Sequence, residues 1–231
     1  MRMLGLSADE LLTTTRAVRK RLDFDRPVDP ELITECLRIA LQAPTGGNLQ
    51  DWQWVVVTDP AKKVALAELY RQSWASYVQS PYFPTNAPPR KDPVVQASYE
   101  RIADSAQYLA DNLERAPAFL IPCLAVRRVD RPSWGGAASR LGSVIQASWS
   151  FMLAARERGL GTCWTTLHLA YEQQAAEILQ IPYEDCTQVA LIPIAHTIGI
   201  DFRPGLRKPM SAVLHWDAWE GAPPSGGDST S

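Results

Sequence analysis

Basic side chains gather where the first predicted helix ends. Arg16, Arg19, Lys20 and Arg21 occur within one short stretch of the chain. A guanidinium group binds phosphate through charge-assisted, forked hydrogen bonds, which makes arginine suited to phosphorylated ligands. Positive charge is also favourable at the carbonyl end of a helix without any ligand. The stretch is therefore either a phosphate-binding segment or a solvated basic turn.

Two further segments combine glycine with hydroxyl or amide groups beside predicted strands. The run APTGGN, residues 43–48, ends a helix, and its two glycines permit close approach of the backbone to a ligand. The run GLGTCWTT, residues 159–166, leaves a core helix and places hydroxyl groups at the end of a strand. Irregular backbone at such a position often carries binding groups. A simple helix-ending loop would have much the same sequence.

A fourth segment, GLRKP at residues 205–209, places the guanidinium of Arg207 near the carboxyl end of the chain. Such a group suits the forked recognition of a phosphate. Each of the four segments is a weak signal by itself. Together they predict a site for a phosphorylated planar ligand, without identifying that ligand.

Several common catalytic motifs are absent from the sequence. It contains no GxGxxG after a strand, no P-loop and no GxSxG elbow. The histidines His168, His196 and His215 have no metal-ligand spacing, so we expect no catalytic metal. No pair of carboxylates indicates acid–base catalysis. The four cysteines are far apart and form no CxxC pair, so we expect buried, reduced thiols.

Composition limits the classes of partner. The 231 residues are 46% hydrophobic and 21% charged, with a formal net charge of −2. This balance gives no electrostatic reason to expect nucleic acid or an anionic membrane as partner. No apolar run approaches the roughly 20 residues that cross a bilayer, and no signal peptide is evident, so we expect a cytoplasmic protein. We expect one domain over residues 1–220 and a disordered tail over 221–231.

Hydrophobic periodicity predicts alternating helices and strands around these segments. The predicted helices cover residues 7–16, 30–43, 60–77, 95–113, 141–158 and 172–179. The predicted strands cover residues 52–58, 117–126, 161–166 and 188–196. Proline-rich or polar loops are expected at residues 79–93 and 127–136. Helices between strands indicate an α/β or α+β fold.

The four segments, in this order, resemble the nitroreductase family of flavoproteins over about residues 11–219. TTRAVRKRLDFDRPV is similar to the family's R-x-S-x-R segment, and APTGGNLQDWQWVVV is similar to its A-P-S-x-x-N-x-Q-P-W element. GLGTCWTT resembles the family's glycine-rich entry to the strand under the flavin, and LRKP resembles its terminal arginine motif. The second and third matches are specific in combination.

The resemblance implies an α+β three-layer sandwich in which helices wrap a mixed sheet. It also implies a homodimer whose subunits exchange terminal arms and together bind FMN. Position by position, Arg16 and Arg207 correspond to the residues that hold the FMN phosphate, with backbone contact from Ala17. Arg19 corresponds to the basic residue at the N1 and O2 edge of the flavin, where a cation stabilises the reduced anion.

The remaining positions of the family's flavin site fall in the two glycine-containing segments. Residues 44–46 correspond to backbone along the pyrimidine edge, and Asn48 corresponds to a ribityl contact that can come from the other subunit. Residues 164–166 correspond to the segment beneath the ring, near N5 and O4. The cofactor-site residues implied by the resemblance are therefore Arg16, Ala17, Arg19, Pro44, Thr45, Gly46, Asn48, Trp164, Thr165, Thr166 and Arg207.

The sequence departs from the family pattern at four positions. Ala17 replaces the usual serine, Thr45 keeps a hydroxyl where serine is usual, and Asp51 replaces the proline before the tryptophan. Gly205 stands where many members carry a second basic residue near the phosphate. These departures predict weaker FMN binding unless Arg203 or Lys208 compensates.

The resemblance implies electron transfer from NADH or NADPH through FMN to an electron-poor acceptor such as a nitroaromatic or quinone, by ping-pong kinetics. Loop 79–93 and its aromatic neighbours are candidates for the acceptor pocket, with ordinary packing as the alternative; these neighbours are Tyr70, Trp74, Tyr77, Tyr82 and Phe83. Two other functions remain open. One is a flavin enzyme for reductive dehalogenation or for oxidation of a biosynthetic intermediate. The other is a flavin-binding protein without turnover.

Overall fold

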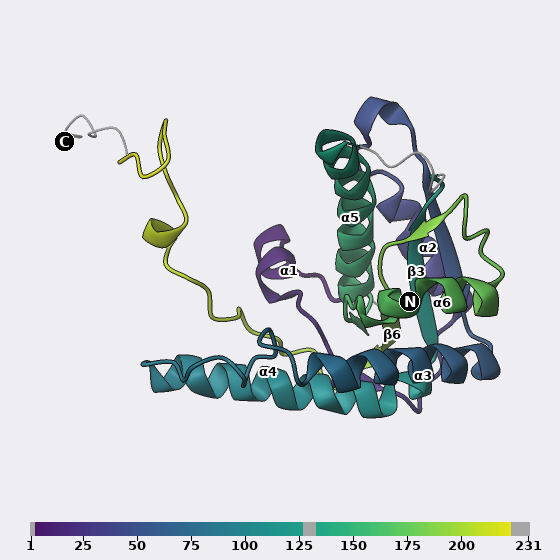
Figure 1. Cartoon of the computed structure of the whole chain (residues 1–231), viewed down its shortest axis with the longest axis horizontal. Coiled ribbons are helices and arrows are strands. Elements are labelled where there is room, and N and C mark those ends of the chain that lie inside the picture. Colours follow the sequence, from purple (N-terminus) through teal and green to yellow (C-terminus); the bar gives the residue numbers. More distant parts are fainter. Residues whose placement is uncertain (1–2, 127–132, 223–231) are drawn as a thin grey trace.

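A computed structural model of the chain describes residues 3–126 and 133–222. Figure 1 shows a layered body from which one long helix pair and the C-terminal segment extend. The helices of the described residues are α1 (Ala8–Thr14), α2 (Pro30–Ala40), α3 (Pro60–Tyr77), α4 (Pro93–Asn112), α5 (Trp134–Glu157) and α6 (Glu172–Leu179). The strands are β1 (Leu22–Asp23), β2 (Trp52–Val57), β3 (Ala118–Leu124), β4 (Leu160–Thr162), β5 (Thr187–Gln188) and β6 (Ile192–Thr197).

The strands form one sheet in the order β1-β6-β3-β2, with β4 paired to β6 and β5 paired to β3. All of these pairs are antiparallel. The expected α+β class is confirmed, but within the described residues the sheet is antiparallel and not mixed. The reason lies in the connections. Two long helices, α3 and α4, lie between β2 and β3 in the chain, and after them the chain re-enters the sheet in the direction opposite to β2. A parallel neighbouring strand would instead follow a single crossover connection.

The central strand β3 supplies both faces of the core. All seven of its residues are buried. Phe119 and Ile121 pack with α3 and α6, whereas Ala118 and Leu120 pack with α2 and α5 on the other face. Successive side chains of a strand point to opposite faces, so one apolar strand fills two interfaces. The result is the expected three-layer sandwich.

Local sequence sets where the helices begin. Asp29, Asp59 and Asp92 each cap a helix whose first residue is proline. An aspartate side chain accepts hydrogen bonds from free amide groups of the first turn, and proline has no amide hydrogen to leave unpaired there. Ser7 and Glu10 form a capping box at α1. The Asp–Pro pairs explain why α3 begins at the residue that the sequence predicted.

Three predicted elements differ most from the structure. Helix α5 begins at Trp134, within the predicted loop, because Ser133 caps it by accepting a hydrogen bond from the amide of Gly136. The predicted strand over 188–196 is two strands, β5 and β6, which pair with different parts of β3. The predicted strand over 161–166 ends at Thr162, and Thr165 forms only an isolated bridge with Leu191. Residues 127–132 and the predicted disordered tail from 223 onward lie outside the described residues.

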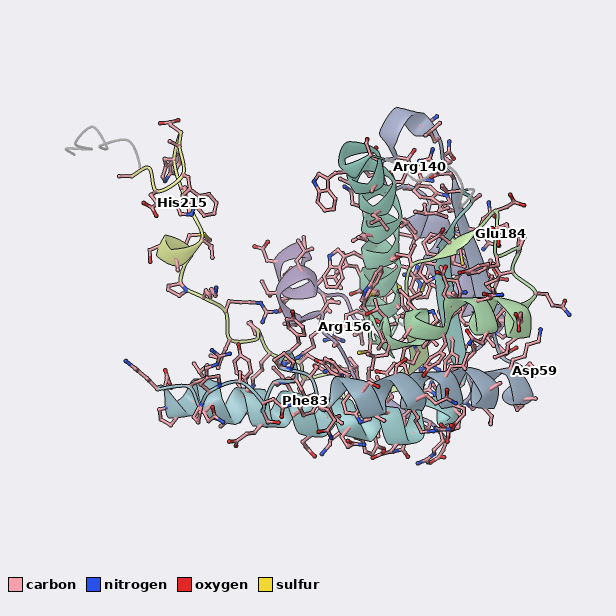
Figure 2. The ribbon with its side chains drawn as sticks, in the orientation of Figure 1. Asp59, Phe83, Arg140, Arg156, Glu184 and His215 are labelled. Atoms are coloured by element: carbon pink, nitrogen blue, oxygen red, sulfur yellow. The ribbon has the colours of Figure 1, made fainter. Side chains whose placement is uncertain are left out.

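The C-terminal segment leaves the body after β6 and runs outward as an arm (Figure 1). It contains one short helical turn, Met210–Ala212, and His215 stacks on Trp219 at a centroid distance of 4.6 Å (Figure 2). The arm carries a series of exposed apolar side chains, namely Leu206, Met210, Val213, Leu214, Trp216 and Trp219. Large exposed apolar surface of this kind marks an interaction site.

The buried histidine of the core makes stability depend on pH. His168 is fully buried, and burial lowers its pKa to about 4, an effect that the side chain of Gln188 partly offsets. Because the unfolded chain binds a proton near pH 6.5 and the folded chain does not, acidification favours unfolding. We expect the free energy of unfolding to fall by about 2 kcal/mol from pH 7 to pH 5.

Urea unfolding followed by circular dichroism at each pH measures this slope. His168→Gln is the matched variant, because it removes the titrating group and should remove that part of the pH dependence whatever its absolute stability. An equal slope in both proteins would contradict the assignment to His168.

Candidate functional site

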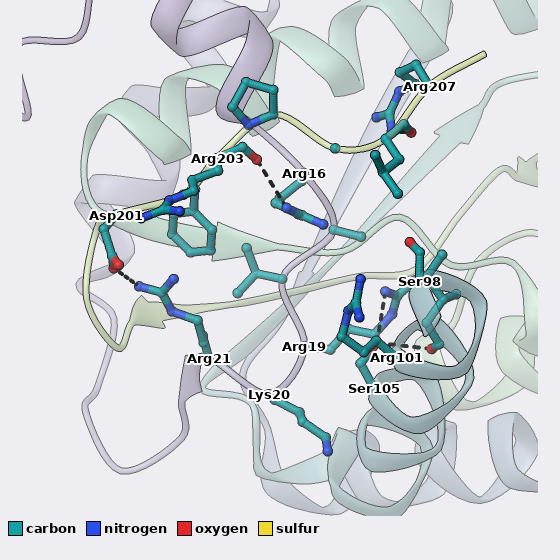
Figure 3. A pocket seen from close by; sticks show the side chains of 17 residues that line it. Arg16, Arg19, Lys20, Arg21, Ser98, Arg101, Ser105, Asp201, Arg203 and Arg207 are labelled. Atoms are coloured by element: carbon teal, nitrogen blue, oxygen red, sulfur yellow. Dashed lines mark hydrogen bonds and ion pairs between the residues drawn. The ribbon is translucent and has the colours of Figure 1, made fainter. Parts of the chain in front are cut away.

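A cavity of about 540 Å³ lies where three distant parts of the chain meet (Figure 3). One wall is the segment 16–21 between α1 and β1, the second is one face of α4, and the third is the root of the C-terminal arm. The lining residues are Arg16, Ala17, Val18, Arg19, Lys20, Arg21, Ser98, Arg101, Ile102, Ser105, Asp201, Phe202, Arg203, Pro204, Gly205, Leu206 and Arg207. Most of the ionic groups in this set are guanidinium groups.

The segment 16–21 is fastened to the sheet beneath it. The amide of Val18 donates a hydrogen bond of 2.8 Å to the carbonyl of Thr162 in β4. The side chain of Val18 is buried against Gly161, where an added Cβ would lie 3.0 Å from it and 2.9 Å from Leu22. Only glycine permits this approach, so the absence of a side chain at position 161 lets the basic segment pack flat on the strand.

The root of the arm is held by stacking. The ring of Phe202 lies between two guanidinium groups, those of Arg21 at 4.2 Å and Arg156 at 4.8 Å from its centroid. Arg156 is buried at the end of α5 (Figure 2) and donates a 2.9 Å hydrogen bond to the carbonyl of Ile200. Arginine stacks favourably on aromatic faces, and burial strengthens the contact. These contacts fix the direction in which the arm leaves the body.

One hydrogen bond joins the two chain ends at the cavity. Arg16 donates from Nη1 to the carbonyl of Arg203 at 3.1 Å, as the dashed line in Figure 3 shows. The partners are 187 residues apart in the sequence. The guanidinium of Arg16 therefore faces the arm, beside the segment that carries Arg207.

Helix α4 supplies the second wall. Ser98, Arg101 and Ser105 follow one another at spacings of three and four residues, which places them on one helix face. Ser105 accepts a long hydrogen bond of 3.5 Å from Nη1 of Arg19 and donates to the carbonyl of Ile102. Figure 3 shows these side chains opposite the arm. Arg19 thus bridges the first two walls.

The cavity has more positive than negative charge. Asp201 forms a 2.7 Å ion pair with Arg21, and this contact together with the nearby Arg203 holds the pKa of the Asp201 carboxyl below its usual range. Lys20 forms an ion pair with Asp104. Among the described residues, four guanidinium groups of the lining form no ion pair and shift the pKa of no carboxyl group. They are those of Arg16, Arg19, Arg101 and Arg207. Such a field attracts and holds anions.

A buried thiol lies behind the first wall, the segment 16–21. Cys163 is fully buried directly after β4, and burial raises the pKa of its thiol, while the nearby guanidinium of Arg19 lowers it. Arg19 therefore reaches from the cavity toward the strand end at residues 160–162. This contact places the cation between the cavity and the GLGTCWTT segment.

The structure brings together four of the residues expected from the sequence. Arg16, Ala17, Arg19 and Arg207 line the one cavity. In the described conformation, Nη1 of Arg207 donates a 2.8 Å hydrogen bond to the carbonyl of the preceding residue, Leu206. Its guanidinium lies over Gly205, where an added Cβ would be 2.7 Å from Nη1. The glycine that departs from the family pattern therefore gives the arginine room to fold back.

The other expected site residues lie outside this cavity. Pro44, Thr45, Gly46 and Asn48 belong to the turn before β2, where the amide of Gly46 donates to Oγ of Ser143 on α5 at 3.2 Å. Trp164, Thr165 and Thr166 follow β4, and the hydroxyl of Thr165 donates to the carbonyl of Leu191 at 2.7 Å. Within one chain neither group lines the cavity.

The aromatic candidates for an acceptor pocket are core residues. Tyr70 and Trp74 are buried, and Trp74 packs edge-on against Tyr77 and Phe83 at centroid distances of 5.7 and 5.6 Å (Figure 2). None of them lines the cavity, and Tyr82 is 85% exposed. Ordinary packing accounts for Trp74, Tyr77 and Phe83, and an acceptor pocket at loop 79–93 stays a prediction.

The sequence argument missed the α4 wall. Ser98, Arg101 and Ser105 occur in a segment that was correctly predicted to be helical. Their spacing reveals a common face, but no local signal shows that this face opposes the segment 16–21. The described residues contain no cluster of histidine, cysteine or acidic side chains suited to a metal. No helix in the same residues is long and apolar enough to span a membrane.

Residues 12–196 match the model of the nitroreductase family. The chain belongs to this family. The matched range covers the basic segment, the two glycine-containing segments and the whole sheet, so family membership rests on most of the body and not on one motif.

Relatives and solved structures agree with this membership. A 62-residue segment is 45% identical to a protein named NADH dehydrogenase from Thermus thermophilus, and it spans only 30% of that relative's length. The FMN and NADPH-dependent nitroreductase NfnB from Sphigopyxis sp. strain HMH is 25% identical, with a TM-score of 0.66 over 93% of this chain and 100% of that one.

Two further solved structures share the fold but are named for other activities or groups. An iodotyrosine deiodinase bound to FMN and 3-iodo-L-tyrosine is 17% identical, with a TM-score of 0.65 over 90% of this chain and 98% of that one. A BluB-like flavoprotein from Clostridium difficile 630 is 16% identical, with a TM-score of 0.65 over 92% of this chain and 99% of that one. At these identities the likeness shows the nitroreductase fold alone.

The close contact at Gly161 gives a sharp test of how the basic segment is held. We expect Gly161→Ala to destabilise the protein by about 1–3 kcal/mol, because the added methyl group overpacks the contact with Val18 and Leu22. Gly135→Ala in the first turn of α5 is the control, since no tertiary atom lies within 4 Å of its added Cβ. Thermal or urea unfolding of both variants measures the difference. Equal stability of the two variants would show that the segment is not tightly packed on β4.

Proposed function

We propose that this protein is an FMN-dependent oxidoreductase that takes electrons from NADH or NADPH and passes them to an electron-poor acceptor such as a nitroaromatic or quinone. One observation carries the proposal. Arginines from both ends of the chain, Arg16 and Arg207, line a single cavity, and Arg16 is bonded to the arm that carries Arg207. Family membership supports the same cofactor.

The residues of the cavity fit a flavin mononucleotide. Arg16 and Arg207 have no carboxylate partner among the described residues, so a phosphate can take that place through charge-assisted hydrogen bonds. To bind the phosphate, Arg207 has to give up only its hydrogen bond to the carbonyl of Leu206. Arg19, steadied by Ser105 and adjacent to Cys163, supplies a cation at the inner end of the cavity. A reduced flavin is anionic, and a fixed cation stabilises that charge.

The chain's own residues then have limited tasks. FMN supplies the electron-transfer chemistry when bound, and the protein supplies binding, orientation and electrostatics. Arg16 and Arg207 hold the phosphate, and Arg19 is a further cation of the same lining. Residues 164–166, which follow the strand fastened to Val18, are assigned in this proposal to the flank of the ring. The described residues contribute no dedicated acid–base set to the cavity.

We also propose that two copies of the chain complete the site. The turn with Thr45 and Asn48 lies off the cavity within one chain, so its proposed contacts to the cofactor require a second subunit. Helix α5 presents an exposed apolar stripe, Trp134, Leu141, Ile145 and Trp149, and the arm presents another. Surfaces of this size need a partner. An exchange of arms between two copies would bury both surfaces together.

The first test is cofactor binding. We expect Arg16→Gln and Arg207→Gln each to weaken FMN binding by about 10- to 100-fold, because each loses a hydrogen-bonded charge pair with phosphate. Quenching of FMN fluorescence on titration measures the affinity. Arg38→Gln is the control, since Arg38 lies on α2 in an exposed ion pair with Glu31, away from the cavity. A wild-type protein that gains no flavin absorbance with FMN would overturn the proposal.

Turnover is tested on the loaded protein. Anaerobic addition of NADH or NADPH should bleach the flavin absorbance, and a nitroaromatic or quinone should restore it, with ping-pong kinetics in the steady state. Bound FMN that neither nicotinamide can bleach would favour a flavin-binding protein without turnover. Faster turnover of a halogenated phenol than of a nitroarene would favour the dehalogenating alternative.

The proposed dimer gives a separate prediction. We expect Ile145→Asp to shift the protein toward monomer and to lower its FMN affinity, because a charge in the α5 stripe opposes burial of that stripe. Light scattering after gel filtration measures the mass, and fluorescence titration measures the affinity. Val64→Asp on α3, at a similarly exposed apolar residue, is the matched control. A wild-type protein that is monomeric while saturated with FMN would contradict the two-chain site.

A further inference from the structure

The proposed function leaves one cation of the cavity without a task. Arg21 and Arg203 share Asp201, and Lys20 is paired with Asp104. The proposed flavin site uses Arg16, Arg207 and Arg19. Arg101 on α4 is the remaining guanidinium of the lining set, and it has no hydrogen bond or ion pair among the described residues.

The acids nearest to Arg101 along its helix are engaged elsewhere. Asp104 forms an ion pair with Lys20, and Glu100 accepts a 3.0 Å hydrogen bond from Gln96, four residues earlier in the same helix. Arg101 itself lies with Ser98 and Ser105 on the face that lines the cavity, opposite the arm (Figure 3). An unpaired arginine in a cluster of like charges raises the electrostatic energy of the empty site, and a bound anion relieves it.

The amount of charge indicates a second anionic group. The lining set contains seven cations, Arg16, Arg19, Lys20, Arg21, Arg101, Arg203 and Arg207, and one acid, Asp201. Asp104 neutralises Lys20 from outside the lining, and the phosphate of one FMN carries about two negative charges. The cavity therefore remains cationic after FMN has bound. Of the cations that remain unpaired, Arg101 lies on the α4 wall, opposite the arm.

We propose that Arg101, assisted by the hydroxyl of Ser98, binds the 2′-phosphate of NADPH and so makes NADPH the preferred electron donor. This inference rests on the proposed function. NADPH differs from NADH only in that phosphate, and a guanidinium recognises a phosphomonoester by forked, charge-assisted hydrogen bonds. The adjacent hydroxyl of Ser98 supplies a further donor on the same helix face. Arg101 acts on the choice of donor and takes no part in the electron transfer.

The direct test uses donor fragments on the FMN-loaded protein. We expect 2′,5′-ADP to bind at least tenfold more tightly than 5′-AMP to the wild type, measured by calorimetry, because the fragments differ by one phosphate. Arg101→Gln should remove most of this difference. Arg90→Gln is the matched control, because Arg90 precedes the same helix but stacks on Tyr99 at 4.7 Å and does not line the cavity. The control should keep the difference.

Kinetics provide a second readout. In Arg101→Gln the KM for NADPH should rise about tenfold more than the KM for NADH, the size expected for one hydrogen-bonded charge pair. The Arg90→Gln variant should keep the wild-type ratio of the two constants. Ser98→Ala should lower the same preference by a smaller factor.

Three results would overturn the inference. The first is equal binding of 2′,5′-ADP and 5′-AMP to the wild type. The second is an equal rise of both KM values in Arg101→Gln. The third is loss of FMN from Arg101→Gln, which would assign this arginine to the flavin phosphate. A wild-type protein that takes up no FMN would instead contradict the proposed function, so the two failures are distinct.

Discussion

The site depends on the contact between segment 16–21 and strand β4. The amide of Val18 donates to Thr162, and the missing side chain of Gly161 lets the segment lie directly on the strand. This contact fixes the backbone that carries Arg16 and Arg19. Because the segment is then continuous with β1, which pairs with β6, the basic residues become part of the sheet's framework and not of a free loop. A rigid backbone is what precise placement of charge requires.

The second constraint is the stack around Phe202. Two arginines, Arg21 and the buried Arg156, hold the ring, and the arm leaves the body from that point. The stack has an energetic cost, because Nε and Nη1 of the buried Arg156 have no hydrogen-bond partner among the described residues. It brings the arm to the opposite wall from α4. The cavity therefore exists because two chain ends, held by unrelated contacts, meet over one edge of the sheet.

Local signals predicted the elements well where capping residues or strong periodicity marked them. The Asp–Pro pairs mark the predicted starts of α2 and α3, whereas α4 begins at Pro93, two residues before its predicted start. The apolar run of β3 was recognisable as a central strand. The break between β5 and β6 and the direction of the sheet were not predictable, because hydrophobic pattern reports burial and not pairing. The early start of α5 was missed because glycines after Ser133 resemble a loop, although the serine caps the helix.

The sequence by itself determined which residues are candidates for binding a phosphorylated planar ligand and which family the chain resembles. It did so because the glycine and arginine motifs are short and local, and each keeps its chemistry wherever the chain places it. Tertiary structure alone decided that Arg16 and the arm share one cavity, that Arg101 faces them from α4, and that Trp74 is core and not pocket. Those facts depend on contacts between residues up to 187 positions apart, and packing, which no local pattern encodes, selects such contacts.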